Sequence, residues 1–206
     1  MRKWPKGALG NFANIGHNGS TWQRRRGRLL LPNFTSDPPP NAVLPPGDYT
    51  LTLAELRQSM LVVGPRPLVP GWDASWRRDL VDRLAVRVAN LKLIGITELF
   101  LAGSFVQNNP VPGDIDGYYM VDPAMWLRVQ RPRLMTVDPL LATMFDKNTW
   151  VYSPEKGKAR PQLWHVARLE LFYVLNTPAN KFPGAIPQYF RRSRQDKPKG
   201  LIRIIL

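Results

Sequence analysis

The 206-residue chain contains no cysteine and only two histidines. The absence of cysteine excludes disulfides, thiolate nucleophiles, iron–sulfur clusters and cysteine-based zinc sites. With so few histidines, a dedicated zinc site is not expected either. His165, which lies beside Trp164 in an apolar segment, is interpreted as a structural histidine. A chain without cysteine is compatible with a reducing compartment.

Long hydrophobic runs are also missing. A membrane span needs roughly 18 consecutive apolar residues, and the most apolar stretch, 91–106, contains Lys92 and Glu98. The basic start of the chain leads into Gly, Asn and His rather than into the apolar core of a secretory signal. The acid-free residues 1–36 leave an organellar transit peptide open, although their Pro, Trp and Gly disfavour one. We expect a cytoplasmic protein without a membrane partner.

Acidic residues are scarce: 15 Asp and Glu stand against 29 Lys and Arg, which gives a net charge of +14. Residues 1–48 are predicted to form a basic, proline-rich arm, whose densest basic run consists of Arg24, Arg25, Arg26 and Arg28. This run either binds nucleic-acid phosphates or is a solvated basic tail. Because aromatic residues are scattered through the arm, we expect it to dock on its own body, on a protein partner or on nucleic acid.

Residues 49–206 have the pattern of a globular domain that mixes helices and strands. The spacing of Leu80, Leu84 and Val88 indicates an amphipathic helix. In chain order, we predict helices at 53–60, 74–94 and 138–145, and strands at 96–102, 114–121, 162–175 and, at the sheet edge, 199–206. A second basic segment, with candidate nucleic-acid contacts, contains Arg191, Arg192 and Arg194.

The most informative motif joins Gly103–Ser104, at the end of a predicted strand, to Asp114 and Asp116 at the start of the next. Alternate residues of a strand point to the same face, so the two carboxylates project together and repel each other. A cation between them offsets this repulsion, and Mg²⁺ prefers such oxygen ligands. The Gly–Ser turn offers a closely approachable backbone and a hydroxyl, which suit phosphate oxygens.

Glu170 is the candidate third carboxylate, because it is an acid inside an otherwise apolar predicted strand. Carboxylates on adjacent strands can hold two divalent ions that clamp the attacking and leaving oxygens of phosphoryl or nucleotidyl transfer. The alternative is an edge-strand acid that forms an ion pair with Arg168 or Arg160. Both interpretations remain open at this point.

The order of helix, strand, Gly–Ser, loop and Asp–Ile–Asp resembles the nucleotidyltransferase superfamily that includes DNA polymerase β. The chain is most similar to small uncharacterised bacterial nucleotidyltransferase-like proteins. The shared segments are 44–47 (Leu-Pro-Pro-Gly), 103–106 (Gly-Ser-Phe-Val), 112–116 (Pro-Gly-Asp-Ile-Asp) and 199–204 (Lys-Gly-Leu-Ile-Arg-Ile). The resemblance covers roughly residues 44–206 and leaves the basic arm unexplained.

The resemblance implies an α+β fold, with a mixed sheet flanked by helices. It also implies Mg²⁺ or Mn²⁺ at Asp114, Asp116 and Glu170, with a nucleoside triphosphate (NTP) near Gly103 and Ser104. The activity would be transfer of a nucleoside monophosphate to a hydroxyl, and the charge of +14 favours RNA, tRNA above all, as the acceptor. By analogy, such small enzymes resemble toxin–antitoxin or phage-defence components. The alternative is a non-catalytic RNA-binding or assembly subunit with the same fold.

Overall fold

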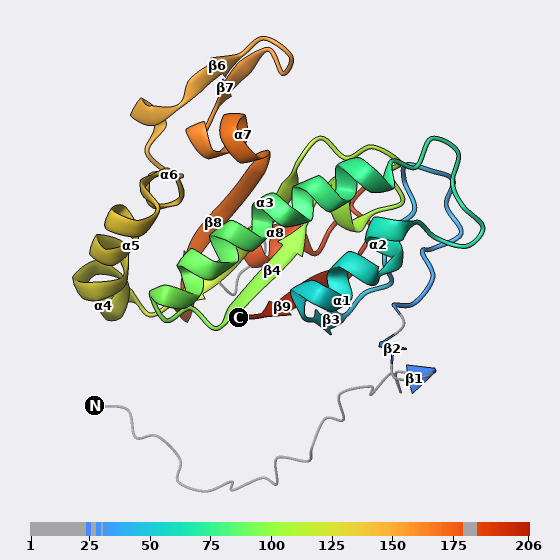
Figure 1. The fold of residues 1–206 in the computed structure, drawn as a ribbon, viewed down its shortest axis with the longest axis horizontal. Coiled ribbons are helices and arrows are strands. Elements are labelled where there is room, and N and C mark those ends of the chain that lie inside the picture. Colours follow the sequence, from blue (N-terminus) through green and yellow to red (C-terminus); the bar gives the residue numbers. More distant parts are fainter. Residues whose placement is uncertain (1–23, 26–27, 30, 179–184) are drawn as a thin grey trace, which may run out of the picture.

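The computed structural model describes residues 24–25, 28–29, 31–178 and 185–206 (Figure 1). Arg26 and most of the predicted arm therefore lie outside the described residues. The backbone of Arg24–Arg25 (β1) pairs antiparallel with that of Arg28–Leu29 (β2). In the described part of the chain, no helix is long and apolar enough to cross a membrane.

The centre of the structure is a five-stranded mixed sheet in the order β3-β9-β4-β5-β8. Its strands are β3 (Asp48–Leu51), β4 (Glu98–Ala102), β5 (Ile115–Val121), β8 (Leu169–Leu175) and β9 (Leu201–Ile205). Strand β4 runs antiparallel to its neighbours β5 and β9, whereas β5–β8 and β3–β9 are parallel pairs. A small hairpin, β6 (Val151–Ser153) with β7 (Lys158–Arg160), is separate from this sheet.

This topology brings distant parts of the sequence to one edge of the sheet. Because β4 is antiparallel to β5 and β9, the end of β4 lies beside the starts of β5 and β9. Strand β8 is parallel to β5 and starts there too. The segment after β4 and the residues that open β5, β8 and β9 therefore meet at this edge.

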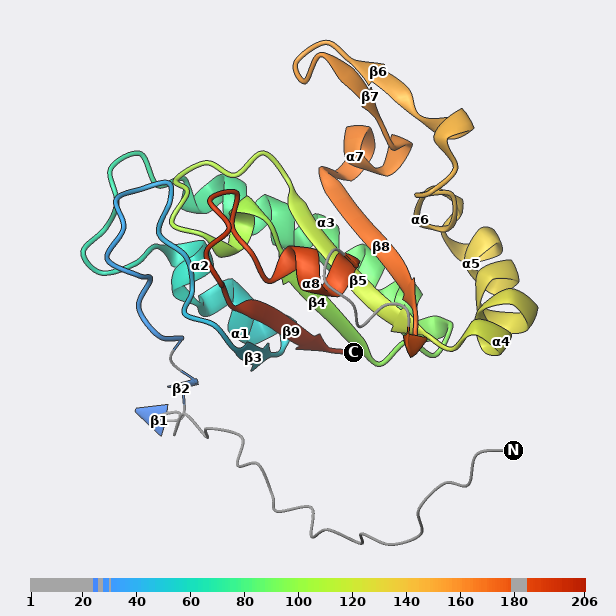
Figure 2. The ribbon, with the colours of Figure 1, turned by 180° about the vertical axis from the view of Figure 1, so that it is seen from behind.

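Helices cover both faces of the sheet. The α-helices are α1 (Leu53–Gln58), α2 (Met60–Val63), α3 (Ala74–Leu93), α4 (Pro123–Met125), α5 (Arg131–Val137), α6 (Pro139–Ala142), α7 (Gln162–Ala167) and α8 (Ile186–Phe190). Shorter turns are the 3-10 helices η1 (Ser104–Val106) and η3 (Lys147–Thr149) and the π-helix η2 (Trp126–Gln130). Helices α1 to α3 lie on one face, and α8 lies on the other (Figures 1 and 2). The mixed α+β class, with flanking helices, is thus confirmed.

The long helix α3 forms where its apolar spacing predicts. Asp73 caps its start by accepting a hydrogen bond from the backbone N–H of Trp76 at 2.8 Å. The predicted stripe Leu80, Leu84 and Val88 is buried against the main core. Shorter helix α1 begins with a capping box between Thr52 and Glu55.

Three predicted elements differ in the structure. The predicted strand at 162–175 is the helix α7 followed by the strand β8, and the chain changes direction at Arg168, which has a left-handed conformation with φ of 56°. The predicted helix at 138–145 is reduced to α6, and α5 precedes it. The predicted edge strand at 199–206 is β9, which lies inside the sheet between β3 and β4.

The packed body begins before β3. Ala42, Val43 and Leu44 are buried, and the backbone N–H of Gly200 donates to the carbonyl of Leu44 at 2.9 Å. The last residues of the predicted arm therefore belong to the core that surrounds the start of β9.

Candidate functional site

Asp116 lies directly against Gly103. Ala102 and Asp116 are register partners across β4 and β5, and a Cβ atom on Gly103 would lie 1.8 Å from Asp116 Oδ2. Gly103 also has a positive φ of 68°, in the region that favours glycine. The structure thus brings the predicted Gly–Ser turn and the predicted carboxylate into contact, and only glycine fits between them.

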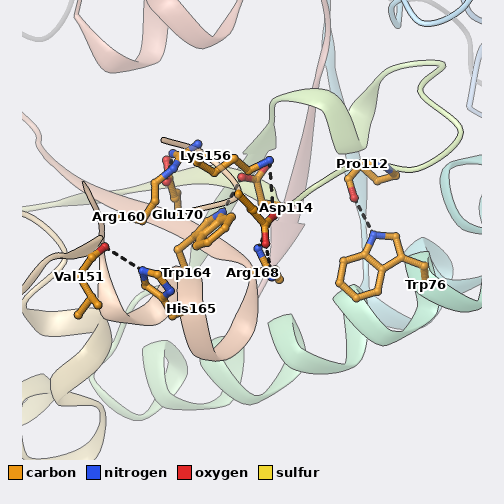
Figure 3. A network of polar contacts seen from close by, with 11 residues as sticks. Trp76, Pro112, Asp114, Val151, Lys156, Arg160, Trp164, His165, Arg168 and Glu170 are labelled. Atoms are coloured by element: carbon orange, nitrogen blue, oxygen red, sulfur yellow. Dashed lines mark hydrogen bonds and ion pairs between the residues drawn. The ribbon is translucent and has the colours of Figure 1, made fainter. Parts of the chain in front are cut away.

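Asp114 is held by a residue from α7. The indole Nε1 of Trp164 donates a hydrogen bond to Asp114 Oδ2 at 2.8 Å (Figure 3). Trp164 is fully buried, and the guanidinium of Arg168 lies 4.1 Å from its ring centroid. Because the indole is fixed by packing, it leaves Asp114 little freedom to turn.

Glu170 stands opposite Asp116 across the parallel pair β5–β8. Directly paired residues of adjacent strands project to the same face. The Glu170 carboxylate forms an ion pair with Arg160, at the end of β7. Arg168 instead binds Glu155 with two hydrogen bonds of 2.9 Å each. Of the two ion-pair partners considered from the sequence, Arg160 is therefore the observed one.

Burial and neighbouring negative charge raise the pKa of Asp116 and of Glu170. Burial, followed by repulsion from Asp114 and Glu170, raises the pKa of Asp116 to about 7, although Lys199 and Arg160 oppose this shift. Burial and the charge of Asp114 also raise the pKa of Glu170, against the attraction of Arg160. The group therefore holds more negative charge than its surroundings neutralise.

The aspartates have the chemistry of a divalent-cation site. Asp116 accepts no hydrogen bond from any residue that the structure describes, although it is partly buried beside two other carboxylates. Asp114 and Asp116 are the residues that would hold Mg²⁺ or Mn²⁺. Within the described ranges, no group of three or more His, Cys, Asp and Glu side chains is arranged to hold a metal. Glu170 would join such a site only by leaving Arg160.

The loop that starts at Ser104 is anchored from beneath by Arg77 of α3. The guanidinium of Arg77 is fully buried and donates to the carbonyl oxygens of Leu61 at 2.5 Å and Phe105 at 2.9 Å, and to that of Asn109. Burial lowers the pKa of Arg77 to about 9. Half-buried Ser104 opens η1 at the top of this loop, beside Gly103.

In the second basic segment, two of the three predicted nucleic-acid contacts are engaged in ion pairs. Arg191 binds Asp48 with hydrogen bonds of 2.7 and 2.9 Å, and Arg192 lies 3.0 Å from Asp196. Arg194 is exposed and has no carboxylate within ion-pair distance among the described residues. Of the basic run in the arm, the structure describes only the backbone of Arg24, Arg25 and Arg28, and Arg26 lies outside the described residues. Its predicted role in binding stays a prediction.

Several residues at this edge were missed by the sequence analysis. They are Lys156, Lys158, Trp164 and Lys199, together with Arg160, which was considered only as an ion-pair partner. Three of these residues, Lys156, Lys158 and Arg160, come from the β6–β7 hairpin. This hairpin reaches the start of β5, because Lys156 Nζ would lie 3.1 Å from a Cβ atom on Gly113. His165 joins α7 to this hairpin, since its Nε2 is 3.0 Å from the carbonyl oxygen of Val151. The signal in the sequence is the run Lys156-Gly157-Lys158, a turn between two short β-prone stretches.

The chain belongs to a family of unknown function, DUF6932, whose family model matches residues 32–205. No curated protein and no solved structure matches it. The matched region includes the whole five-stranded sheet and the carboxylate site, and it starts before the residues that this chain buries at 42–44.

Proposed function

We propose that this member of a family of unknown function is a divalent-metal-dependent nucleotidyltransferase with a polymerase-β-like fold. It would move a nucleoside monophosphate from an NTP to a hydroxyl group, with RNA as the favoured acceptor. The observation that carries the proposal is the contact of Asp116 with Gly103, which puts paired carboxylates beside a Gly–Ser turn. The charge of +14 supports a polyanionic acceptor.

In this reaction the acceptor oxygen bonds to the α-phosphorus of the NTP, the bond from that phosphorus to the bridging oxygen breaks, and pyrophosphate leaves. Asp114 and Asp116 would hold the metal, which would neutralise charge on the attacking and leaving oxygens. The Trp164 hydrogen bond fixes Asp114 for this task. Gly103 lets the backbone approach the triphosphate, and Ser104 presents its hydroxyl there.

Glu170 is the residue assigned to take the proton of the acceptor hydroxyl. Its pKa is raised by burial, so its carboxylate is a better proton acceptor than an exposed one. Arg160 must first release it, because the ion pair occupies the same carboxylate.

Label transfer tests the proposal. Purified protein is incubated with each α-labelled NTP, Mg²⁺ or Mn²⁺ and total RNA, beside an Asp114→Ala/Asp116→Ala variant. Label on RNA that is absent with the variant supports the enzyme and identifies nucleotide and acceptor class. Label transfer that the variant retains would refute the site.

The second candidate is a non-catalytic RNA-binding or assembly subunit. The observation that favours it is the Arg160–Glu170 ion pair, which satisfies the third carboxylate without a metal. No transfer, together with salt-sensitive RNA binding that the aspartate variant retains, would support this function instead.

A further inference from the structure

The carboxylate site is surrounded by cationic side chains, most of which are already paired. Arg160 forms an ion pair with Glu170. Arg168 binds Glu155 at 2.9 Å, and Lys156 lies 3.9 Å from the same carboxylate. These groups neutralise acids of the protein itself.

Lys158 and Lys199 are different. Within the described ranges, neither has a carboxylate at ion-pair distance. Exposed Lys158 acts electrostatically on Glu170, and Lys199 acts on Asp116. Lys158 opens β7, whose last residue, Arg160, pairs with Glu170, and Lys199 lies just before β9, whose neighbour β4 ends beside Asp116.

Lys199 is unusual because it is only 5% exposed. A buried ammonium group without a paired anion loses its hydration and gains little in return. Burial accordingly lowers the pKa of Lys199 to about 8, against the attraction of Asp116. The position is structurally fixed: a Cβ on the next residue, Gly200, would lie 2.4 Å from the carbonyl oxygen of Pro45. A partly desolvated cation held in place is suited to an anionic ligand.

We propose that Lys199 and Lys158 form a polyphosphate subsite that holds the β- and γ-phosphates of the nucleotide. The segment 103–113 contains no Lys or Arg, so the Gly–Ser loop itself offers no cation to the phosphates. Lys199 and Lys158 supply that charge from other elements. A recessed ammonium is reached by the end of a phosphate chain more readily than by a continuous nucleic-acid backbone, which favours a triphosphate over RNA. This subsite rests on the proposed function for the identity of its ligand.

The test uses inorganic tripolyphosphate as the probe, without divalent metal, and measures its dissociation constant by calorimetry. Lys199→Met keeps the buried stem and removes the charge, and Lys158→Ala removes the exposed partner. Loss of a charge-assisted contact should weaken binding about tenfold for Lys199→Met and less for Lys158→Ala. The matched control Lys92→Ala, on the exposed side of α3, should bind as the wild type does. Asp114→Ala/Asp116→Ala should bind more tightly, because repelling carboxylates are gone.

Circular dichroism and a thermal unfolding midpoint for each variant separate loss of binding from loss of fold. Wild-type protein that does not bind tripolyphosphate, or a folded Lys199→Met variant that binds it as well as the wild type, would overturn the subsite. Polyuridine without a terminal phosphate is the competing ligand. If it displaces tripolyphosphate and loses affinity equally in Lys199→Met, the site belongs to nucleic acid and the triphosphate assignment is wrong.

Failure of this inference can be distinguished from failure of the proposed function. Lys199-dependent tripolyphosphate binding without label transfer would leave the subsite standing and refute the enzyme. Label transfer with an unchanged KM for NTP in Lys199→Met would support the enzyme and refute the subsite.

Discussion

The indole of Trp164 donates to the carboxylate of Asp114 at 2.8 Å, and this bond joins α7 to the start of β5. The same indole is covered by Arg168, whose guanidinium is bound to Glu155 of the β6–β7 hairpin. The hairpin, the helix and the carboxylate strand are therefore linked through one side chain. A substitution of Trp164 should therefore alter the position of Asp114 as well as the packing of the core.

Trp164→Phe should reduce both the proposed nucleotidyl transfer and the stability of the fold. Phenylalanine retains most of the buried ring but has no N–H, so Asp114 loses its donor. We expect kcat/KM to fall about tenfold, as for loss of a hydrogen bond to a charged group, and the free energy of unfolding to fall by about 2 kcal/mol. Steady-state kinetics and urea denaturation measure the two effects. Unchanged kinetics in a destabilised protein would show that the hydrogen bond does not position Asp114.

Gly103→Ala should abolish the proposed binding of a divalent metal at Asp116. The added methyl group would meet Asp116 Oδ2 at 1.8 Å, so the carboxylate must move away from the turn. Gly95→Ala is the matched control: Gly95 also has a positive φ, of 83°, and a Cβ there meets nothing within 4 Å. Both substitutions should cost about 1–3 kcal/mol of backbone strain. Mn²⁺ binding, followed by electron paramagnetic resonance, should be lost only in Gly103→Ala; equal loss in both variants would contradict this interpretation.

Arg77→Met should destabilise the protein more than an exposed arginine change does. Arg77 is fully buried, and its guanidinium satisfies carbonyl oxygens of the loop that follows Gly103. Methionine fills the space of the stem but leaves these carbonyls without donors. We expect a loss of about 3 kcal/mol or more in the free energy of unfolding. Arg78→Met, at the neighbouring exposed position of α3, is the control and should change it by less than about 0.5 kcal/mol. Equal losses in the two variants would argue against this anchoring role.

Local patterns sufficed for much of the fold. The stripe of α3 has helical spacing over a long segment, and residues 114–121 form a short β-prone run after a polar, proline-containing turn, so both were located. The segment 162–175 was not, because the short apolar run of α7 has the composition of a buried strand and its length does not distinguish the two. That error hid Trp164 from the site.

Long-range pairing accounts for the other differences. Lys199 and Asp116 are distant in sequence and come near each other only because β9 inserts between β3 and β4. Nothing in the stretch 199–206 distinguishes an edge strand from an inner one, since strand order depends on the rest of the sheet. The pairing of Arg191 with Asp48 is equally invisible in the sequence, where the charged residues nearest to Arg191 are the basic Arg192 and Arg194.

Asp116→Asn should stabilise the metal-free protein at high pH. The pKa of Asp116 is about 7 in the folded chain, against an ordinary value of 3.8. Between these values the folded chain binds more protons than the unfolded chain, so this group's contribution to stability falls as pH rises from about 4 to 7. It stays low above pH 7. Asparagine has no charge to bury, so the variant should melt at least about 2 °C higher than the wild type at pH 8. At pH 4 the two proteins should melt at about the same temperature.

A control variant and the addition of Mg²⁺ show whether this pH dependence of stability comes from the carboxylate site. Asp82→Asn changes an exposed acid on α3 that pairs with Arg57, and it should not produce the same pH dependence. Mg²⁺ should raise the melting temperature of the wild type at pH 8, where Asp116 is ionised, and should do so less in Asp116→Asn. A wild-type melting temperature that does not fall between pH 5 and 8, with Asp116→Asn no more stable, would show that Asp116 is not held as an uncompensated carboxylate. The metal site would then lose its main electrostatic support.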